Sequence, residues 1–395
     1  MGCGIMTEIK VDNIVNLAGT GKPNFPVSPT VGASGSALST LNTYSYTSSA
    51  TEPSNPKNGA LWWDSANNKV FVYIAGEFKE IELGTAYSSG IAWGGDRTLS
   101  TDENSLQIDY FDMTTTTNAA DFGDLTQQWS GINGSFSDSS RGVMHNDNKA
   151  SPVTTTNLEY VTISTPGNAS NFGNGRYGTV NTSGASDATY GVISCGFKFG
   201  SPNVTINDIY YVTIQTLGNA ANFGDQTVAA SSRAGISNAT YAVFGGGYNY
   251  DGSTGTLTNV MDYFAIATTG NATDFGDISV ARKDMAGCED DTRGVFVGGR
   301  VYGYNTSDWY NTMEYITVAT PGNTTDFGDL TAGRGDLGAA GNGTRGVIVG
   351  GIEYPWASIV NTVEYITIQT TGNAADLLDL SQAASRPACF SGDAS

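Results

Sequence analysis

One unit of about fifty residues recurs six times along this 395-residue chain. Its most regular segment is Gly-Asn-Ala-x-Asp-Phe-Gly-Asp, and the aromatic position of that segment, which we call the anchor, recurs every 50 to 52 residues. The anchors are Phe122, Phe172, Phe223, Phe275, Phe327 and Leu377. A tyrosine precedes each anchor by twelve residues, at Tyr110, Tyr160, Tyr211, Tyr263, Tyr315 and Tyr365. Such regular repetition predicts that every unit forms the same element and packs on its neighbours.

A third element of the unit is an apolar run that ends in a double glycine, eighteen residues after the anchor. The clearest copies begin at Arg293 and Arg345, weaker ones begin at Tyr190 and Tyr241, and one displaced by a single residue begins at Arg141. In the sixth unit this run would begin only at Ser395. The segment Ser89–Gly95, which precedes the first tyrosine, has the matching pattern, so we expect it to supply the missing strand.

Two kinds of strand are expected within each unit. The segment Tyr365–Ile368 alternates large and polar residues, as a half-buried strand does, whereas Gly294–Val297 is continuously apolar and suits an inner strand covered on both faces. A period near fifty with a double glycine is typical of Kelch-type propeller blades, each of which is a small twisted antiparallel sheet. The chain is therefore predicted to be all-β.

The predicted fold is a six-bladed Kelch-like β-propeller closed by an N-terminal strand. Borrowing the last strand from the other end of the chain would hide a sheet edge that is otherwise prone to aggregation. The alternative is an open stack of sheets, which would leave the sixth unit incomplete and the segment 87–95 unused. We expect the closed form.

The anchor segment has a structural interpretation and a functional one. An asparagine stands four residues before each anchor, and glycine precedes it in five of the six copies, which suggests a turn with positive φ. The acids around the anchor, such as Asp274 and Asp277, would accept backbone N–H bonds in that turn. Calcium binding is the alternative, but no copy has the full EF-hand pattern, so we expect no metal and no cofactor. The anchor ring is expected to pack between neighbouring blades.

Charge excludes two classes of partner. The chain has 38 acidic residues against 18 Lys and Arg, for a net charge of −20, which is the opposite of a nucleic-acid binder. An anionic membrane would repel it, and no window approaches eighteen apolar residues. The first residues lack the charged and hydrophobic regions of a secretory signal, so we expect a soluble protein that the usual export route does not carry.

Three domains are expected. Residues 1–51 are rich in Ser, Thr and Gly toward their end and are predicted to be an extended arm or linker. Residues 52–84 contain alternating runs on both sides of Ala66-Asn67-Asn68 and after Gly76, which predict a small β-meander too short for a core of its own. Residues 85–395 form the predicted propeller.

Several motifs resemble those of tail-fibre-like and other virion structural proteins of tailed bacteriophages, particularly marine ones. They are Asn58-Gly59-Ala60-Leu61-Trp62-Trp63-Asp64-Ser65, the arm segment 13–21 and repeats such as Gly270–Asp277. The resemblance implies an N-terminal segment that joins the virion and a C-terminal domain that faces outward. The sequence departs from the pattern at His145-Asn146, where Gly-Gly is expected, and at Leu377-Leu378, which replace Phe-Gly.

The resemblance also implies partners and a location. The protein is expected in the virion, assembled in the host cytoplasm and exposed on the particle surface, with other virion proteins bound through the arm. Candidate attachment residues in the arm are Val11, Ile14, Val15, Leu17 and Phe25. A homo-oligomer, such as a trimer, is expected. We expect no nucleic-acid partner and no membrane insertion.

Candidate ligand-binding residues lie in the loops between the double glycine and the following tyrosine. They are Tyr248, Tyr250, Tyr302, Tyr304, Trp309, Tyr354 and Trp356, interspersed with Asn and Asp. Flat aromatic rings beside amides and carboxylates suit sugar rings, and exposed aromatics mark interaction surfaces. The alternative is that these rings pack across blades or against another subunit.

Enzymatic activity is not expected. The chain has a single histidine, His145, which argues against a Ser-His-Asp triad and against a histidine-rich metal site. Most acids of the repeats recur at fixed positions, such as Asp109 and Glu159 just before the tyrosine, which favours a structural role. The leading hypothesis is a tail fibre or peripheral appendage that contacts a glycan or protein of the host surface. The alternatives are a capsid or tail decoration protein without a receptor role and, less favoured, a polysaccharide depolymerase with a carboxylate pair.

Overall fold

The protein is all-β. The computed structural model describes residues 46–49, 51, 61–64, 69–74, 77–81, 89–93, 106–126, 132–146, 157–200, 202–301, 308–354 and 358–392. The chain divides into two compact units, Met1–Thr85 and Ala86–Ser395. Within these residues the regular elements are strands, and no helix is long and apolar enough to cross a membrane.

The first unit contains one sheet of four strands, β1-β2-β3-β4. Its strands are β1 (Tyr46–Ser49), β2 (Leu61–Asp64), β3 (Lys69–Ile74) and β4 (Glu77–Ile81). The last three strands pair antiparallel, as a meander does, and their positions match the alternating runs of the sequence. β1 pairs parallel with β2 and comes from the segment that the sequence assigns to the arm.

In the second unit, six sheets share one plan of four antiparallel strands. In sheet order they are β34 (Cys389–Ser391), β5 (Ser89–Trp93), β6 (Gln107–Asp112) and β7 (Ala120–Asp124); β8 (Ile132–Ser137), β9 (Arg141–Asn146), β10 (Asn157–Thr162) and β11 (Ser170–Asn174); β13 (Ser183–Ser186), β14 (Tyr190–Lys198), β15 (Val204–Thr213) and β16 (Ala221–Asp225); β17 (Ala234–Ser237), β18 (Tyr241–Gly245), β21 (Val260–Ala265) and β22 (Thr273–Asp277); β23 (Ala286–Glu289), β24 (Arg293–Val297), β25 (Thr312–Thr317) and β26 (Thr325–Asp329); and β28 (Gly338–Gly341), β29 (Arg345–Val349), β32 (Thr362–Thr367) and β33 (Ala375–Asp379).

Short strands lie at the loops. They are β12 (Thr179–Val180), β19 (Tyr248–Tyr250), β20 (Gly255–Leu257), β27 (Arg334–Gly335), β30 (Ile352–Glu353) and β31 (Ser358–Ile359). β12 extends one of the six sheets, and the others form two small sheets of their own. β12 pairs with β14, β19 with β20, and β30 with both β27 and β31.

The burial of the strands follows the two expected patterns. The apolar run from Gly294 to Val297 in β24 is fully buried, because β23 and β25 pair with it and neighbouring sheets cover it. In β32, Tyr365 is half-buried, Ile366 is buried and Thr367 is exposed. Both predictions of strand type are confirmed.

The anchor rings lie in the cores between consecutive sheets, as predicted. Phe122 of β7 shares a core cluster with Val161 and Ile163 of the next sheet, and its ring meets Tyr110 edge-on at 5.8 Å between centroids. Leu377 occupies the same position in the cluster that joins the last sheet to Phe111 of β6. Six such clusters, each built from two consecutive sheets, form the core of the described part of the unit.

The two ends of the second unit meet in one sheet. β34, near the end of the chain, pairs antiparallel with β5, with Cys389 opposite Ala92 and Ser391 opposite Gly90. The first strands contact one another in the order β8, β13, β17, β23, β28 and β34, and β34 in turn contacts β8. The predicted strand near residue 90 is therefore present and joins the last strand of the chain.

The asparagine of the repeat has a different role from the predicted one. Its backbone does not adopt positive φ at the described positions; instead, its side-chain oxygen accepts the backbone N–H of the Asp or Asn that follows the anchor in the preceding sheet. Asn271 and Asp225, for example, form this bond at 3.1 Å. Positive φ falls on the glycine after the anchor, such as Gly123, where a Cβ would overlap the carbonyl oxygen of Gly167. Among the glycines before these asparagines, Gly372 alone has positive φ, at 159°, so the predicted positive-φ turn is not found in the other described copies.

Candidate binding surface and axial cavity

Each sheet has a loop end and a turn end. Because adjacent strands run antiparallel, the connections from second to third strand and those from one sheet to the next emerge together, and we call this side the loop end. The double glycines begin the longer loops there. Gly246 and Gly247 have φ of 63° and 115°, and Gly247 N–H donates to the Arg282 carbonyl oxygen of the next sheet at 2.8 Å. The loops are therefore anchored to their neighbours.

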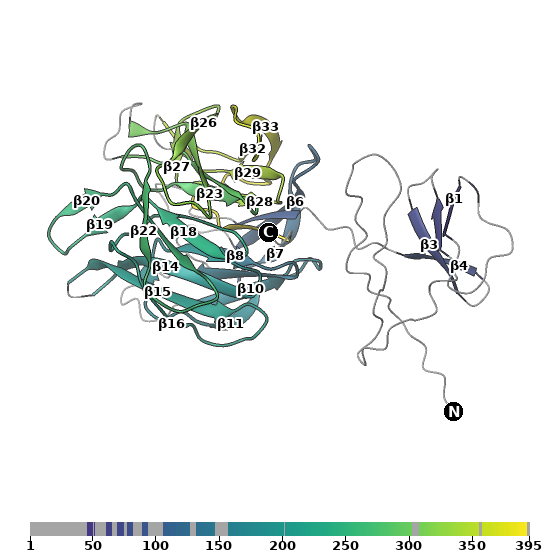
Figure 1. Cartoon of the computed structure of the whole chain (residues 1–395), viewed down its shortest axis with the longest axis horizontal. Coiled ribbons are helices and arrows are strands. Elements are labelled where there is room, and N and C mark those ends of the chain that lie inside the picture. Colours follow the sequence, from purple (N-terminus) through teal and green to yellow (C-terminus); the bar gives the residue numbers. More distant parts are fainter. Residues whose placement is uncertain are drawn as a thin grey trace. The chain divides into compact units, whose positions relative to one another are not determined.

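A hairpin at the loop end presents two of the predicted tyrosines. β19 and β20 pair antiparallel and project from the body of the second unit (Figure 1). The rings of Tyr248 and Tyr250 stack with 6.3 Å between centroids, and both are half-buried. Thr205 of β15 holds the hairpin, since its hydroxyl accepts the Tyr250 N–H at 2.9 Å. Two of the predicted residues therefore lie side by side in the structure.

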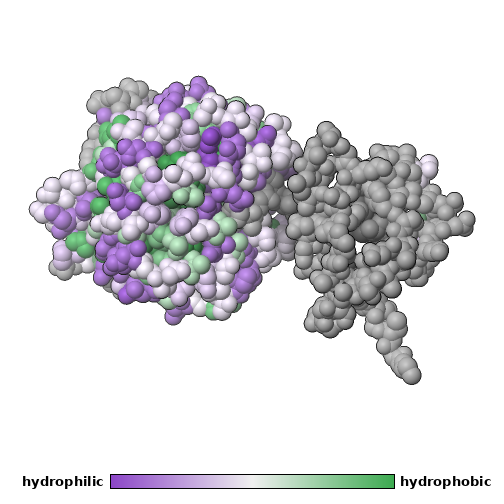
Figure 2. Space-filling view, viewed as in Figure 1, coloured by the Kyte–Doolittle hydropathy of each residue, from purple (hydrophilic) through white to green (hydrophobic). Residues whose placement is uncertain are grey.

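The two tyrosines continue into a longer series of rings. Phe197 lies 6.0 Å from Tyr250 and 5.1 Å from Phe199 between ring centroids, and the Lys283 ammonium lies 5.6 Å from the Tyr248 ring. We call these five residues the aromatic row. Phe199 is 37% exposed, one of three large exposed hydrophobic side chains in the described residues. Figure 2 shows that pale and hydrophilic residues cover most of the face in view.

The sequence did not identify Phe197 and Phe199. Both lie where β14 continues past Gly196, at the end of the longest hairpin of the repeat. A signal was present, because the alternation of Phe, Lys and Phe after this glycine extends the strand beyond the usual double-glycine position.

The remaining predicted residues are placed differently. Trp309 is 8% exposed and lies beneath Arg300, whose guanidinium is 5.1 Å from the ring, so packing within the unit accounts for it and its face is closed to a ligand. Tyr354 is half-buried in the turn after β30. Candidates outside the described residues are Tyr302, Tyr304, Trp356, Val11, Ile14, Val15, Leu17 and Phe25.

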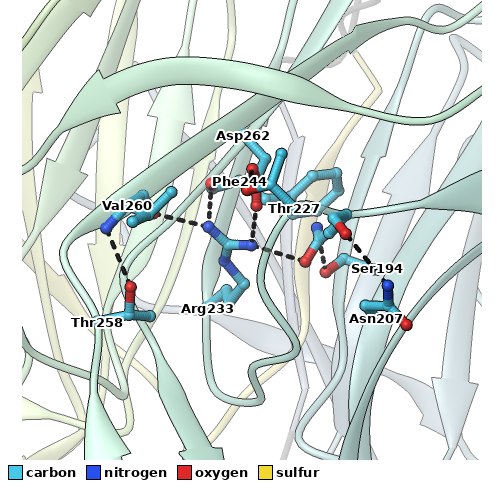
Figure 3. A network of polar contacts seen from close by, with 9 residues as sticks. Ser194, Asn207, Thr227, Arg233, Phe244, Thr258, Val260 and Asp262 are labelled. Atoms are coloured by element: carbon cyan, nitrogen blue, oxygen red, sulfur yellow. Dashed lines mark hydrogen bonds and ion pairs between the residues drawn. The ribbon is translucent and has the colours of Figure 1, made fainter.

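Three of the repeated carboxylates pair with an arginine that precedes the first strand of their own sheet. Asp262 is fully buried and pairs with Arg233 at 2.5 Å, and Arg233 also donates to Gln226 and to the carbonyl oxygens of Phe244 and Val260 (Figure 3). The pairs Arg282–Glu314 and Arg334–Glu364 occupy the same place in the next sheets. Burial alone would raise the pKa of Glu314, but Arg282 and the hydrogen bonds from Ser279 and Thr324 lower it overall.

Two of the repeated acids have hydroxyl partners. Glu159 accepts from the N–H and hydroxyl of Thr126, and Asp109 accepts from the N–H of Ser381 at 2.9 Å and from its hydroxyl. Each bond joins the acid to the preceding sheet. The acids at the fixed position are thus held by structural contacts, as the sequence led us to expect.

His145 is a buried structural side chain. It is 1% exposed, its Nδ1 lies 3.1 Å from the Thr182 hydroxyl, and its ring faces Tyr210. Burial lowers the pKa of His145 to about 4, so the ring is neutral at physiological pH.

A polar cavity of about 140 Å³ lies between the first strands of the sheets. Its wall consists mainly of Ser, Gly and Ala residues. Glu289 lies near the turn end, and Asp284, Asp336 and Arg386 lie near the loop end. At the loop end, backbone hydrogen bonds connect one sheet to the next. The Asp336 N–H donates to the backbone carbonyl oxygen of Asp284 at 2.9 Å, and the Arg386 N–H donates to the backbone carbonyl oxygen of Asp336 at 2.6 Å.

Charges at the loop end of the cavity neutralise one another. Asp284 lies 2.9 Å from Arg300 and 3.0 Å from Lys283, and Asp336 lies 2.7 Å from Arg386. Burial opposes the ionisation of Asp284, yet these cations hold its pKa well below its ordinary value. Within the described residues, no three His, Cys, Asp or Glu side chains gather as a metal site would require.

Comparisons with known proteins give no family for this chain. No model of a protein family matches the sequence, and no curated protein matches it.

Proposed function

We propose that the second unit is a six-bladed Kelch-like β-propeller closed by the pairing of β34 with β5. Three relationships support this proposal: the cyclic order of contacts among the first strands, the cores between consecutive sheets, and the Asn bond that recurs between sheets. A closed ring leaves the outer face of each sheet and the loop end to interact with partners.

We propose further that the protein is a non-enzymatic structural component of a bacteriophage virion, in a tail fibre or a similar appendage that contacts the host surface. The observation that carries this function is the aromatic row, in which the stacked rings of Tyr248 and Tyr250 on the β19–β20 hairpin continue into Phe197 and Phe199 at the end of β14. Rings of this kind stack on sugar faces and supply contact area at a low cost in side-chain entropy. The motifs that resemble tail-fibre-like proteins supply the virion context.

The other partners belong to the same proposal. Residues 1–51 would bind other virion proteins, and several copies, for example in a trimer, would present their loop ends together on the particle surface. Weak individual contacts then give firm attachment, because linked sites raise the effective concentration of one another. The repeated acids form ion pairs within the protein, as Asp262 does with Arg233, and this supports a role without catalysis.

Binding by the full chain tests the receptor role. The full-length protein, displayed in several copies on beads, is exposed to cells of candidate marine hosts and to lipopolysaccharide purified from them. We expect the triple variant Tyr248→Ala, Tyr250→Ala and Phe199→Ala to weaken the binding of host cells to the beads at least about tenfold. Each lost stacking contact removes about 0.5–1.5 kcal/mol.

The matched control is Leu217→Ala, which removes a 52% exposed hydrophobic side chain at the turn end. This variant should bind as the parent does. If the parent binds no host material in multivalent form, the alternative of a decoration protein without a receptor role replaces the proposal. Hydrolysis of the polysaccharide during the assay would instead favour a depolymerase.

A further inference from the structure

Six equivalent positions form a ring around the turn end of the axial cavity. Each position is the last residue of the first strand of a sheet, and it pairs with a residue at the start of the second strand. Glu289, for example, pairs with Gly294, and Ser237 pairs with Ala242. The six residues are Ser137, Ser186, Ser237, Glu289, Gly341 and Ser391. Glu289 is thus the one carboxylate at a position that otherwise carries serine or glycine, and it lines the cavity.

Three of the four serine hydroxyls of this ring donate to protein acceptors. Ser137 donates to the Ser391 carbonyl oxygen at 2.6 Å, and Ser186 donates to the Ser137 carbonyl oxygen at 2.9 Å. Ser237 donates to the carboxylate of Glu289 through both its hydroxyl and its N–H. A serine hydroxyl has one hydrogen and two lone pairs, so what these residues can still offer to a ligand is acceptor capacity.

The two arginines that line the cavity have other partners, since Arg233 pairs with Asp262 and Arg386 with Asp336. The packed strands β17 and β28 carry no titratable side chain, and Cys389 of β34 is an uncharged thiol. Asp290 and Asp291 follow in the adjoining turn, and Arg293 of β24 turns away to the Tyr315 ring and the Ile368 carbonyl oxygen. Burial, and then the charge of Asp290, raise the pKa of Glu289 to about 8.

We propose that the axial cavity binds a small primary ammonium ligand, with the Glu289 carboxylate as its counter-ion and serine hydroxyl oxygens of the ring as further acceptors. An ammonium group has three N–H donors, which one carboxylate and neighbouring hydroxyls can satisfy. A cavity of about 140 Å³ admits such a group with a short polar tail. A bare divalent metal ion fits less well, since it prefers several charged or carbonyl oxygens and one carboxylate supplies few.

Calorimetric titration of the full-length protein with methylammonium and with ethanolammonium, in an amine-free buffer, tests the proposal. We expect binding at pH 9 and a loss of affinity of about tenfold per pH unit below pH 8, because a proton then competes for the carboxylate. Glu289→Ser, which installs the residue found in four of the other sheets, should abolish binding. Glu289→Gln should do the same while keeping the size of the side chain.

The control is Asp291→Asn, which removes an exposed charge two residues away and should retain binding. Melting temperatures establish that each variant is folded. The proposal is overturned if methylammonium fails to bind the folded parent at pH 9, if Glu289→Ser binds it equally well, or if calcium binds in its place with methylammonium excluded. None of these outcomes bears on host-cell binding by the aromatic row, which is measured separately.

Discussion

The side chain of Asn118 accepts the backbone N–H of Asp379 at 3.2 Å and so joins residues that are 261 positions apart. The same bond joins Asn168 to Asp124 and Asn373 to Asp329, where the partners are 44 positions apart. The junction between the two ends of the repeat region is therefore built like the junctions inside it.

Replacing this asparagine tests whether the junction exists in solution. Asn118→Ala and Asn271→Ala should each lower the free energy of unfolding by about 1 kcal/mol, because each leaves a backbone N–H without its acceptor. Urea denaturation of the two variants measures the comparison. A loss for Asn271→Ala without a loss for Asn118→Ala would show that the ends of the repeat region do not meet.

A second prediction concerns the aromatic ring of β34. Phe390 is 4% exposed and lies against Gly142 of β9, where a Cβ would overlap its ring; Phe136 lies in the same way against Gly191. Phe390→Ala should destabilise the protein by about 3–5 kcal/mol, as should Phe136→Ala, because each leaves a cavity between two sheets. Thermal melting compares them, and near-parental stability of Phe390→Ala would contradict the closing role of β34.

The buried histidine makes stability depend on acid pH. The pKa of His145 is about 4 in the folded state against an ordinary 6.5, so the unfolded chain binds more protons between these values. Its contribution is present above pH 6.5 and is lost as the pH falls toward 4, by about 3 kcal/mol.

His145→Gln should flatten this part of the profile. The urea midpoints of parent and variant are measured between pH 4 and 7. Titration of the carboxylates shifts both midpoints alike and cancels in their difference, which leaves the effect of His145. Parallel profiles would mean that the ring is not buried in its neutral form.

Glu289 makes stability depend on alkaline pH with the opposite sign. Its pKa is raised from 4.5 to about 8, so the folded protein binds more protons between these values, and the contribution present below pH 4.5 is lost as the pH rises toward 8. In amine-free buffer, Glu289→Ser should therefore gain roughly 3 kcal/mol over the parent between pH 5 and 9. A constant difference across that range would refute the raised pKa.

The buried pair of Arg334 and Glu364 supplies a final prediction. Both side chains are fully buried, and burial lowers the pKa of Arg334. Glu364→Gln should cost about 3–5 kcal/mol, because it leaves a buried charge uncompensated. Arg334→Met combined with Glu364→Gln should recover most of that loss in urea denaturation. A double variant worse than the single one would indicate that the Arg334 guanidinium stabilises the protein through other groups, such as Glu353 at 3.9 Å.

The departures from the repeat near residues 377–378 have a structural counterpart. Elsewhere the glycine after the anchor packs closely against the glycine before the next asparagine, as Gly123 does with Gly167. At the junction of the two ends, the equivalent positions are Leu378 and Thr117, and Leu378 is buried in the core that also holds Phe111. Both positions of this junction therefore differ from the glycine pair of the other junctions.

The sequence by itself determined the periodic features of this protein. The interval between Tyr110 and Phe122, the apolar run of β24 and the strand near Ser89 all depend on local pattern, and a repeat multiplies a local signal until it is unambiguous. For the same reason the structural role of Asp109 and Glu159 was predictable, since a residue present in nearly every unit serves what all the units share.

Only the tertiary structure decided the contacts between units. The repeat asparagine reaches the preceding sheet, Trp309 lies under Arg300, and Phe197 meets Tyr250 across two sheets, and no local pattern specifies such distances. Glu289 became notable only when the register of each sheet aligned it with four serines and a glycine around a cavity. The physical reason is that a strand's pattern fixes which side chains are buried, whereas the packing of neighbouring sheets fixes what they meet.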